Sequence, residues 1–186
     1  LGYDVGKCPL DCWIYQEIIY DTKPDIIIEC GTCVGGSALF FANMLEIIGK
    51  TNGKVFSIDG NPSCRGVKEY PKIEFLVGAT IDPKIVNYIK EKIKPTDKVM
   101  VDLDSDHNKR YVLPEMRVYS ELVTKGCYMI VEDGNINGHP VLPNWGEGPS
   151  EAIEEFLKEN KKFVVDKKRE KSLLTWNPNG YLQKIE

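Results

Sequence analysis

The chain has 186 residues, a formal net charge of −4 and a hydrophobic fraction of 42%. This length suffices for one α/β domain with a full core, and we expect residues 1–186 to form a single domain. The negative charge argues against a general nucleic-acid-binding protein, and no apolar run approaches the ~20 residues of a membrane span. Because the chain begins with Leu1 rather than Met, we expect a trimmed N-terminus from which targeting information has been lost.

The cysteine content favours a protein of a reducing compartment. An even number of cysteines is compatible with disulfides, but a chain of this size with an ordinary hydrophobic content does not need them. We therefore expect mostly reduced thiols and a cytoplasmic location. Cys30 and Cys33 form a C-x-x-C motif, for which a redox dithiol is the alternative interpretation. The six cysteines are Cys8, Cys12, Cys30, Cys33, Cys64 and Cys127.

The first part of the chain predicts a helix, a buried strand and a second helix. Asp11 is a candidate N-cap for a helix over residues 12–22, which ends before Pro24. Residues 26–30 form an apolar run without alternation, which is typical of a strand covered on both faces of a parallel sheet. A helical pattern of apolar residues follows over residues 38–48.

A glycine-rich turn joins this strand to the second helix and predicts a cofactor site. Gly31 and Gly35 allow the backbone to approach a ligand, and Glu29 would point a carboxylate into the same crevice. The spacing lacks the middle glycine of a dinucleotide fingerprint, and no lysine precedes Ser37 as it would in a P-loop. The acid-x-Gly-x-x-x-Gly-x-Ser pattern instead resembles the first motif of S-adenosylmethionine (SAM) methyltransferases of the catechol O-methyltransferase type.

Two further strands are predicted, and the first of them ends in an acid that suits a nucleoside. Residues 54–59 end with Asp59, and an acid at this position can accept hydrogen bonds from both ribose hydroxyls. Residues 73–77 form the next strand, which is followed shortly by Ala79 and Thr80.

Three carboxylates fall at the carboxyl ends of two later strands. In an open α/β sheet these ends line one crevice beside the cofactor. Acids there repel one another unless a cation neutralises them, and oxygen ligands suit Mg²⁺, Mn²⁺ or Ca²⁺. Solvated strand ends are the alternative. The strands cover residues 98–103 and 127–131, helices are expected over 82–93 and 109–123, and the acids are Asp104, Glu132 and Asp133.

His107 lies three residues after Asp104 and is a candidate general base beside the cation. A histidine at the surface or at the cap of the next helix is the alternative interpretation. Asp106 could hold His107 or cap that helix.

Residues 134–149 predict a long loop with apolar and aromatic side chains, and such loops are usually functional. It begins directly after the predicted metal ligands, so we expect a lid over the crevice, with His139 and Trp145 as substrate contacts. His139 could instead order the loop, and Trp145 could form a subunit contact in a homo-oligomer.

The last part of the chain predicts one helix and a pair of strands. Ser150 is the expected N-cap of a helix that extends to about residue 159. Residues 163–165 and 172–176 are expected to form a terminal strand pair, with the charged run 166–171 as its turn. Together with the preceding elements, this predicts an α/β fold with a mostly parallel sheet.

Several motifs together resemble the cephalosporin hydroxylase family, which includes sugar (rhamnosyl) O-methyltransferases. The similarity covers the chain from about Asp11 onward, and its Leu-Asp-Ser-Asp-His and Glu-Asp motifs are specific in combination. The motifs are residues 27–41, 103–107, 131–133, 137–143, 175–178 and 180–182.

This resemblance implies a Rossmann-like class I methyltransferase fold with a seven-stranded sheet, SAM at the first motif and Mg²⁺ beside it. It implies that Asp59 binds the ribose and that the catechol enzymes' lysine base is replaced by His107. The remaining implied contacts are Gly31, Thr32, Gly35 and Ser37 with the methionine end of SAM, Ala79 and Thr80 near the adenine, and Asp104, Glu132 and Asp133 with the metal.

The first functional interpretation is a metal-dependent SAM O-methyltransferase that acts on a hydroxyl of a small molecule or sugar. The metal would lower the pKa of the hydroxyl, and a nearby base would take its proton. The alternatives are a hydroxylation-related tailoring enzyme, as the family name suggests, and a non-catalytic SAM- or nucleoside-binding module. The two histidines lack the spacing of a two-His-one-carboxylate iron site.

Overall fold

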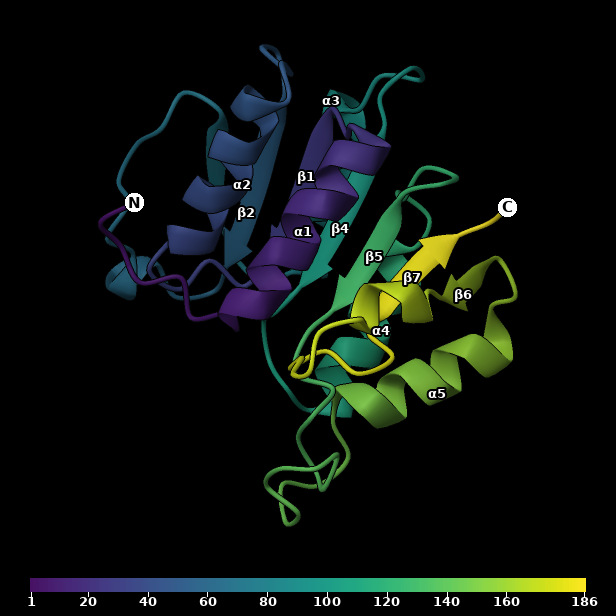
Figure 1. Cartoon of the computed structure of the whole chain (residues 1–186). Helices are drawn as coiled ribbons and strands as arrows, with labels where there is room; N and C mark the ends of the chain where they lie inside the picture. Colours follow the sequence, from purple (N-terminus) through teal and green to yellow (C-terminus); the bar gives the residue numbers. More distant parts are fainter.

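The computed structural model describes residues 1–186, with the exception of the side chain of Cys64. Within these residues, seven strands form one sheet in the order β3-β2-β1-β4-β5-β7-β6 (Figure 1). The strands are β1 (Ile26–Cys30), β2 (Lys54–Asp59), β3 (Ile73–Val77), β4 (Val99–Leu103), β5 (Tyr128–Val131), β6 (Phe163–Val165) and β7 (Tyr181–Lys184).

The sheet is parallel from β1 to β5 and antiparallel at its C-terminal end. β7 pairs antiparallel with both β5 and β6. The chain builds outward from β1 to β3 and then returns to place β4 on the other side of β1, so the strand order reverses between β1 and β4. Ligands of open α/β sheets bind outside the carboxyl ends of the strands at such a reversal. The predicted α/β fold with a mostly parallel sheet is confirmed.

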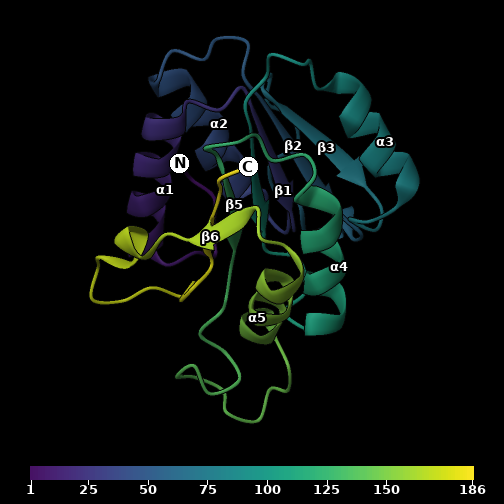
Figure 2. The same ribbon diagram turned by 90° about the vertical axis from the view of Figure 1, so that its right-hand side faces the viewer.

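Helices cover both faces of this sheet (Figure 2). One face carries α1 (Pro9–Thr22) and α2 (Gly36–Ile47), and the other carries α3 (Pro83–Lys92), α4 (Lys109–Tyr119) and α5 (Pro149–Glu159). In α5, the ring of Phe156 is 1% exposed and packs edge-on against Phe163 with 5.6 Å between ring centroids. Burial of such a ring stabilises the fold by roughly 1.5–3 kcal/mol.

Alternation along the central strands decides which side chains face which helices. Ile28 and Val101 belong to the core under α3, α4 and α5, whereas Ile27 and Met100 belong to the core under α1 and α2. Because successive side chains of a strand point to opposite faces, Glu29 and Asp102 also face α1 and α2. They are direct neighbours in the register of β1 and β4.

The first helix starts earlier than predicted, and Asp11 is not its cap. α1 begins at Pro9 with Cys8 as N-cap. Asp11 is 1% exposed, and its carboxylate accepts hydrogen bonds from the Trp176 backbone N–H and the Tyr181 hydroxyl, both at 2.8 Å. Both carboxylate oxygens of Asp11 therefore have a hydrogen-bond partner although the side chain is buried. These bonds connect α1 to the C-terminal segment.

The cap of α5 is also different from the prediction. Gly148 rather than Ser150 is the N-cap, and the Glu151 carboxylate accepts the Gly148 N–H at 2.6 Å. Pro149 occupies the first helical position, where its missing N–H costs nothing.

The predicted pairing of residues 163–165 with 172–176 is wrong. β6 pairs with β7, the charged run forms a short 3-10 helix, η2 (Lys167–Glu170), and residues 172–176 form no strand. Tyr181 and Leu182 become fully buried on opposite faces of the sheet, whereas Leu173 remains fully exposed. Burial of that pair outweighs the local strand propensity of residues 172–176.

The expectation of mostly reduced cysteines stays a prediction. Cys8, Cys12, Cys30 and Cys127 are free, so Cys30 and Cys33 form no disulfide. The expectation for the Cys64 thiol lies outside the described residues. A search of the described helices for a segment long and apolar enough to cross a membrane finds none.

Candidate active site

The glycine turn lies directly against the strand that carries the first predicted metal ligand. Gly31 has a φ of +105°, which favours glycine, and a Cβ atom there would lie 1.9 Å from the backbone oxygen of Asp104. The Asp104 N–H donates to the carbonyl of Cys30 at 2.8 Å. The turn after β1 and the end of β4 are therefore in backbone contact, which any side chain at residue 31 would prevent.

A row of buried polar groups crosses the sheet beneath this turn. Ser57, Glu29 and Asp102 are paired across β2, β1 and β4, and all are 0% exposed. The Ser57 hydroxyl donates to Glu29 Oε2, and Ser57 and Thr32 share a hydrogen bond of 2.7 Å. Thr32 is thereby held beneath the turn rather than open to solvent.

One carboxylate oxygen of Glu29 is buried without a hydrogen-bond partner in the described part of the chain. Burial raises the pKa of its carboxyl to about 7, although the charge of Lys7 and hydrogen bonds from Ser37 and Ser57 act in the opposite direction. Among the described residues, Glu29 Oε1 has no hydrogen-bond partner. A buried acceptor without a partner costs free energy, so this oxygen suits a ligand donor such as an amino group.

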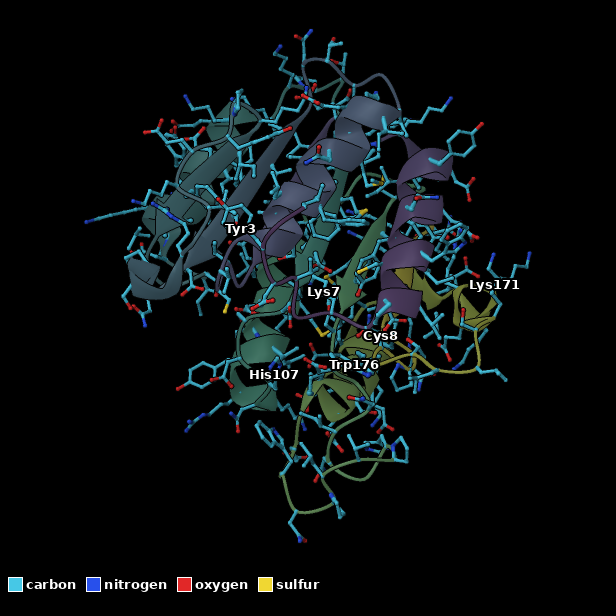
Figure 3. All side chains as sticks on the ribbon, turned by 60° about the vertical axis from the view of Figure 1, so that its left-hand side comes forward. Tyr3, Lys7, Cys8, His107, Lys171 and Trp176 are labelled. Carbon is cyan, nitrogen blue, oxygen red and sulfur yellow. The ribbon has the colours of Figure 1, made fainter. Side chains whose placement is uncertain are left out.

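Lys7 lies on the N-terminal segment (Figure 3), and its side chain reaches three carboxylates at the end of the sheet. Its ammonium lies 3.2 Å from Asp102 Oδ2 and 2.9 Å from Asp104 Oδ2, and it also donates to Glu132 Oε1. Burial alone would lower the pKa of Lys7, but the charges of the surrounding carboxylates raise it well above its usual value. Lys7 is therefore a buried ammonium with a carboxylate partner for each of its three N–H groups.

Two of the three predicted metal ligands, Asp104 and Asp133, lie together, and His107 takes the place predicted for Glu132. Asp104, His107 and Asp133 each offer a ligand atom, and these atoms lie within 4.8 Å of one another. Glu132 is next to them in sequence but directs Oε1 at Lys7. His107 Nδ1 lies 3.4 Å from Asp133 Oδ2, and its side chain is 34% exposed. The arrangement offers carboxylate oxygens for a hard divalent cation and an imidazole at its edge.

Asn177 holds the backbone of Asp133 in place. Asp133 has a φ of +54°, a left-handed value for a residue with a side chain, and its N–H donates to Asn177 Oδ1 at 3.0 Å. Asn177 is 0% exposed, and its amide Nδ2 donates to the Tyr15 hydroxyl at 2.6 Å. The C-terminal loop and α1 thus jointly position one candidate metal ligand.

A cavity of about 360 Å³ opens beside this cluster at the ends of β2, β3 and β4. Its wall includes Ser105 and Asp106, which lie between Asp104 and His107 in the chain. Glu115 closes one side, accepting hydrogen bonds from Ser105 and Thr80. Of the predicted cofactor residues, Gly31, Asp59, Ala79 and Thr80 line the cavity, and Glu29, Thr32, Gly35 and Ser37 lie in or beneath the glycine turn.

Asp59 also holds the glycine turn. Its Oδ2 accepts the Cys33 N–H at 2.8 Å and its Oδ1 accepts the Asn61 N–H at 2.7 Å. Asp59 therefore lines the cavity while its carboxylate joins the end of β2 to the turn after β1. This gives the backbone a defined shape where a cofactor would lie.

The loop 134–149 contacts the cluster through Trp145. The indole Nε1 donates to the His107 backbone oxygen at 3.1 Å, and the two ring centroids are 6.3 Å apart. His139 lies at the base of the loop, where its Nε2 is 2.9 Å from Glu151 Oε1. In this conformation Trp145 packs on the candidate base, and His139 orders the loop.

Comparison with known families agrees with this geometry. A family model described as "Rhamnosyl O-methyltransferase/CmcI" matches residues 1–185. This chain belongs to that family. The resemblance inferred from the sequence motifs is therefore confirmed.

Three similar proteins illustrate the family and its fold. The rhamnosyl O-methyltransferase of Mycobacterium tuberculosis (strain ATCC 25618 / H37Rv) is 39% identical over 187 residues, covering 98% of this chain and 76% of that protein. A solved structure described as "cmcI-D160 Mg-SAM" matches with a TM-score of 0.72 at 20% identity, covering 97% of this chain and 73% of that one. MycE methyltransferase in complex with Mg, SAH and mycinamycin VI matches with a TM-score of 0.65 at 15% identity, covering 92% and 48%.

The sequence analysis did not identify a role for three residues of this site, Lys7, Asp102 and Asn177. Asp102 carries a signal that could have been used, because a lone acid in the otherwise apolar β4 needs a buried partner. Lys7 carries no such signal, since its partners are 95 or more residues away in the chain. Asn177 lies in the 175–178 motif, but the motif does not show that its partner is Asp133, 44 residues away.

We predict that Glu151→Gln destabilises the protein at neutral pH but not at low pH. Burial would raise the pKa of Glu151, but hydrogen bonds from Gly148, His139 and Asn137 hold it at about 2. Because an unfolded glutamate titrates near ~4.3, the ionised form favours folding; this contribution is complete above that pH and is lost as the pH falls through 2. Urea unfolding should show a loss of about 1–2 kcal/mol at pH 7 that shrinks toward zero near pH 2. Glu154→Gln, an exposed change on the same helix, is the control. If Glu151→Gln lowered the free energy of unfolding by the same amount at pH 7 and pH 2, the low pKa of Glu151 would not be the cause.

Proposed function

We propose that this protein is a SAM-dependent, divalent-metal-assisted O-methyltransferase that acts on a hydroxyl of a sugar or another small molecule. The observation that carries the proposal is the direct adjacency of two sites. The cavity at the strand ends and the Asp104–His107–Asp133 cluster share the segment after β4, and Gly31 touches both. Methyl transfer to oxygen needs a methyl donor and an activated hydroxyl held side by side.

The cavity fits the nucleoside part of SAM. Asp59 would accept the ribose hydroxyls, and Ala79 and Thr80 would lie near the adenine. The methionine end would reach the glycine turn, where the unpartnered Glu29 Oε1 can accept from its amino group. The other residues proposed at this end are Gly31, Thr32, Gly35 and Ser37. The rhamnosyl O-methyltransferase relatives and the SAM-bound structure of similar fold support this assignment.

The cluster fits a hard cation, for which we propose Mg²⁺. Asp104 and Asp133 would hold it with carboxylate oxygens. Glu132 lies outside this group of three and would have to release its hydrogen bond with Asp102 to contribute its second oxygen. When bound, such an ion lowers the pKa of the acceptor hydroxyl and orients it. We assign His107 as the base rather than as a ligand because Mg²⁺ takes oxygen ligands.

His107 is placed to receive the proton of the acceptor hydroxyl. Its Nδ1 faces Asp133, whose carboxylate stabilises the imidazolium that forms. Trp145 lies beside the ring and, as part of a lid, would exclude water from the reacting oxygen. His139 would act at the loop base, and a direct contact with the acceptor would require it to leave Glu151.

The alternative of a hydroxylating enzyme receives no support from the ligand set. The one candidate metal cluster of the described residues contains a single histidine, whereas a non-haem iron triad needs two. We further propose that residues 1–186 act as one catalytic domain, supported by the single sheet that contains every described strand. A cytoplasmic location and a homo-oligomer remain predictions.

A methyl-transfer assay tests the proposal. With SAM, Mg²⁺ and rhamnose-bearing acceptors, we expect mass spectrometry to detect a product heavier by one methyl group. A chelator should abolish the product and added Mg²⁺ should restore it, and Asp104→Asn should reduce turnover at least ~100-fold because it removes a ligand charge. Binding of SAM without transfer to any hydroxyl would favour the binding-module alternative.

We predict that Asp59→Ala weakens SAM binding by about 1.5–3 kcal/mol, the range for a hydrogen bond to a charged group. The reason is that Asp59 faces the cavity and also holds the turn through the Cys33 N–H. Asp97→Ala removes a similar surface carboxylate in the turn before β4 and should leave the affinity unchanged. Calorimetry that finds equal SAM affinity in Asp59→Ala and wild type would refute the ribose assignment.

We predict that Trp145→Ala raises the KM of the acceptor or lowers kcat while SAM affinity and oligomer size stay constant. The lost indole lies beside the His107 ring and donates to the His107 backbone oxygen, so its removal would open the reacting oxygen to water. Trp13→Ala, which removes a 62% exposed indole from the outer face of α1, is the matched control. Dissociation into smaller species by light scattering, with unchanged kinetics per subunit, would show a subunit contact instead.

A further inference from the structure

The acidic crevice gathers several carboxyl groups around one lysine. Among the described residues, five carboxylates gather at the carboxyl edge of β1, β4 and β5, and Lys7 is the ammonium that reaches them. The five are Glu29, Asp102, Asp104, Glu132 and Asp133. Like charges at this spacing in a buried site repel one another strongly.

Asp102 is a buried carboxylate that needs the Lys7 ammonium as its partner. Its side chain is 0% exposed in the middle of the sheet, and Oδ2 faces the Lys7 ammonium at 3.2 Å. A buried carboxylate deprived of its cation is strongly destabilising. An ion held by Asp104 and Asp133 lies nearer the crevice mouth, where these side chains are 19% and 21% exposed, so it does not replace the cation beside Asp102.

Lys7 occupies one oxygen of each carboxylate that it shares with the candidate metal site. It binds Asp104 through Oδ2, so Asp104 keeps its second oxygen for an ion, and it binds Glu132 through Oε1, while Glu132 also hydrogen-bonds Asp102. The candidate ligand atoms of Asp104, His107 and Asp133 lie together while Lys7 is in place. The three N–H groups of the ammonium also fix the orientation of both carboxylates.

We propose that Lys7 is a resident second cation of the metal centre. Its ammonium stays among Asp102, Asp104 and Glu132 when the divalent ion is bound, and it positions Asp104 and Glu132 as ligands. Lys7 is a positioning residue that acts through these carboxylates. The inference rests on the metal site of the proposed function and adds a requirement to it.

The N-terminal segment that carries Lys7 is built into the fold. The Asp4 carbonyl oxygen would lie 2.0 Å from a Cβ at Gly36, so only glycine lets the segment cross the start of α2. Cys8 is 2% exposed and caps α1. Figure 3 shows Tyr3, Lys7 and Cys8 along this segment, below α2 and toward α1. Lys7 can therefore reach the metal site only when residues 1–8 are packed against α1 and α2.

Amine labelling of the wild-type protein tests whether Lys7 stays. Lysines are labelled with an acylating reagent, with and without saturating Mg²⁺, and rates are read by peptide mass spectrometry. Lys7 should react at least ~10-fold more slowly than exposed Lys125 under both conditions. Lys72, which is 7% exposed and bound to backbone carbonyls, is the matched buried control. Labelling of Lys7 at the rate of Lys125 once Mg²⁺ is bound would overturn the proposal, because it would show displacement.

Calorimetric titration with Mg²⁺ tests whether Lys7 positions the ligands. Lys7→Met should bind Mg²⁺ about 10–100-fold more weakly, the usual effect of losing an outer partner of metal ligands. Lys7→Arg, which keeps the charge, should recover part of the loss, and Lys72→Met should bind as wild type. Unchanged or tighter binding by folded Lys7→Met would mean that Lys7 competes with the metal and would overturn the proposal.

The outcomes separate this inference from the proposed function. If wild type gives no heat with Mg²⁺, the metal proposal itself fails, and this inference fails with it. If wild type binds Mg²⁺ and Lys7 becomes reactive, only the resident-cation inference fails. If Lys7→Met does not fold by circular dichroism, the labelling of wild type and the affinity of Lys7→Arg still decide between residence and displacement.

Discussion

Compensation of buried negative charge is the constraint on which this structure depends. Glu29, Asp102 and Glu132 lie on one face of the sheet and are at most 4% exposed. Carboxylates are not stable there without cations or protons. In this structure the Lys7 ammonium lies among them, and burial raises the pKa of Glu29 to about 7. The N-terminal segment, α1 and the carboxyl edge of the sheet are arranged around this requirement.

Strand order explains why the cavity proposed for the methyl donor and the candidate metal cluster lie together. The reversal between β1 and β4 opens a crevice at which the turn after β1 meets the segment after β4. Because residue 31 is a glycine, the turn after β1 comes into backbone contact with Asp104 at the end of β4. A sulfonium methyl group and an acceptor oxygen can therefore approach without any large rearrangement of the sheet.

Contacts from distant parts of the chain complete the site. Asn177 fixes the left-handed backbone of Asp133, Tyr15 fixes Asn177, and Asp11 fixes the C-terminal segment that carries it. Outer hydrogen bonds of this kind orient metal ligands and tune their affinity. The family relationship to rhamnosyl O-methyltransferases is consistent with such a preorganised site.

The sequence by itself determined the α/β class, most strands, the glycine turn and the acids at the strand ends, because periodicity and chemistry at these positions are local properties. It also identified the family through its motifs. Tertiary structure decided that β7 rather than residues 172–176 joins the sheet, that Asp11 binds the C-terminal segment, and that Glu132 shares an ammonium with Asp102. These outcomes depend on which buried surfaces and charges meet across the fold, and no pattern within a short window of sequence contains that information.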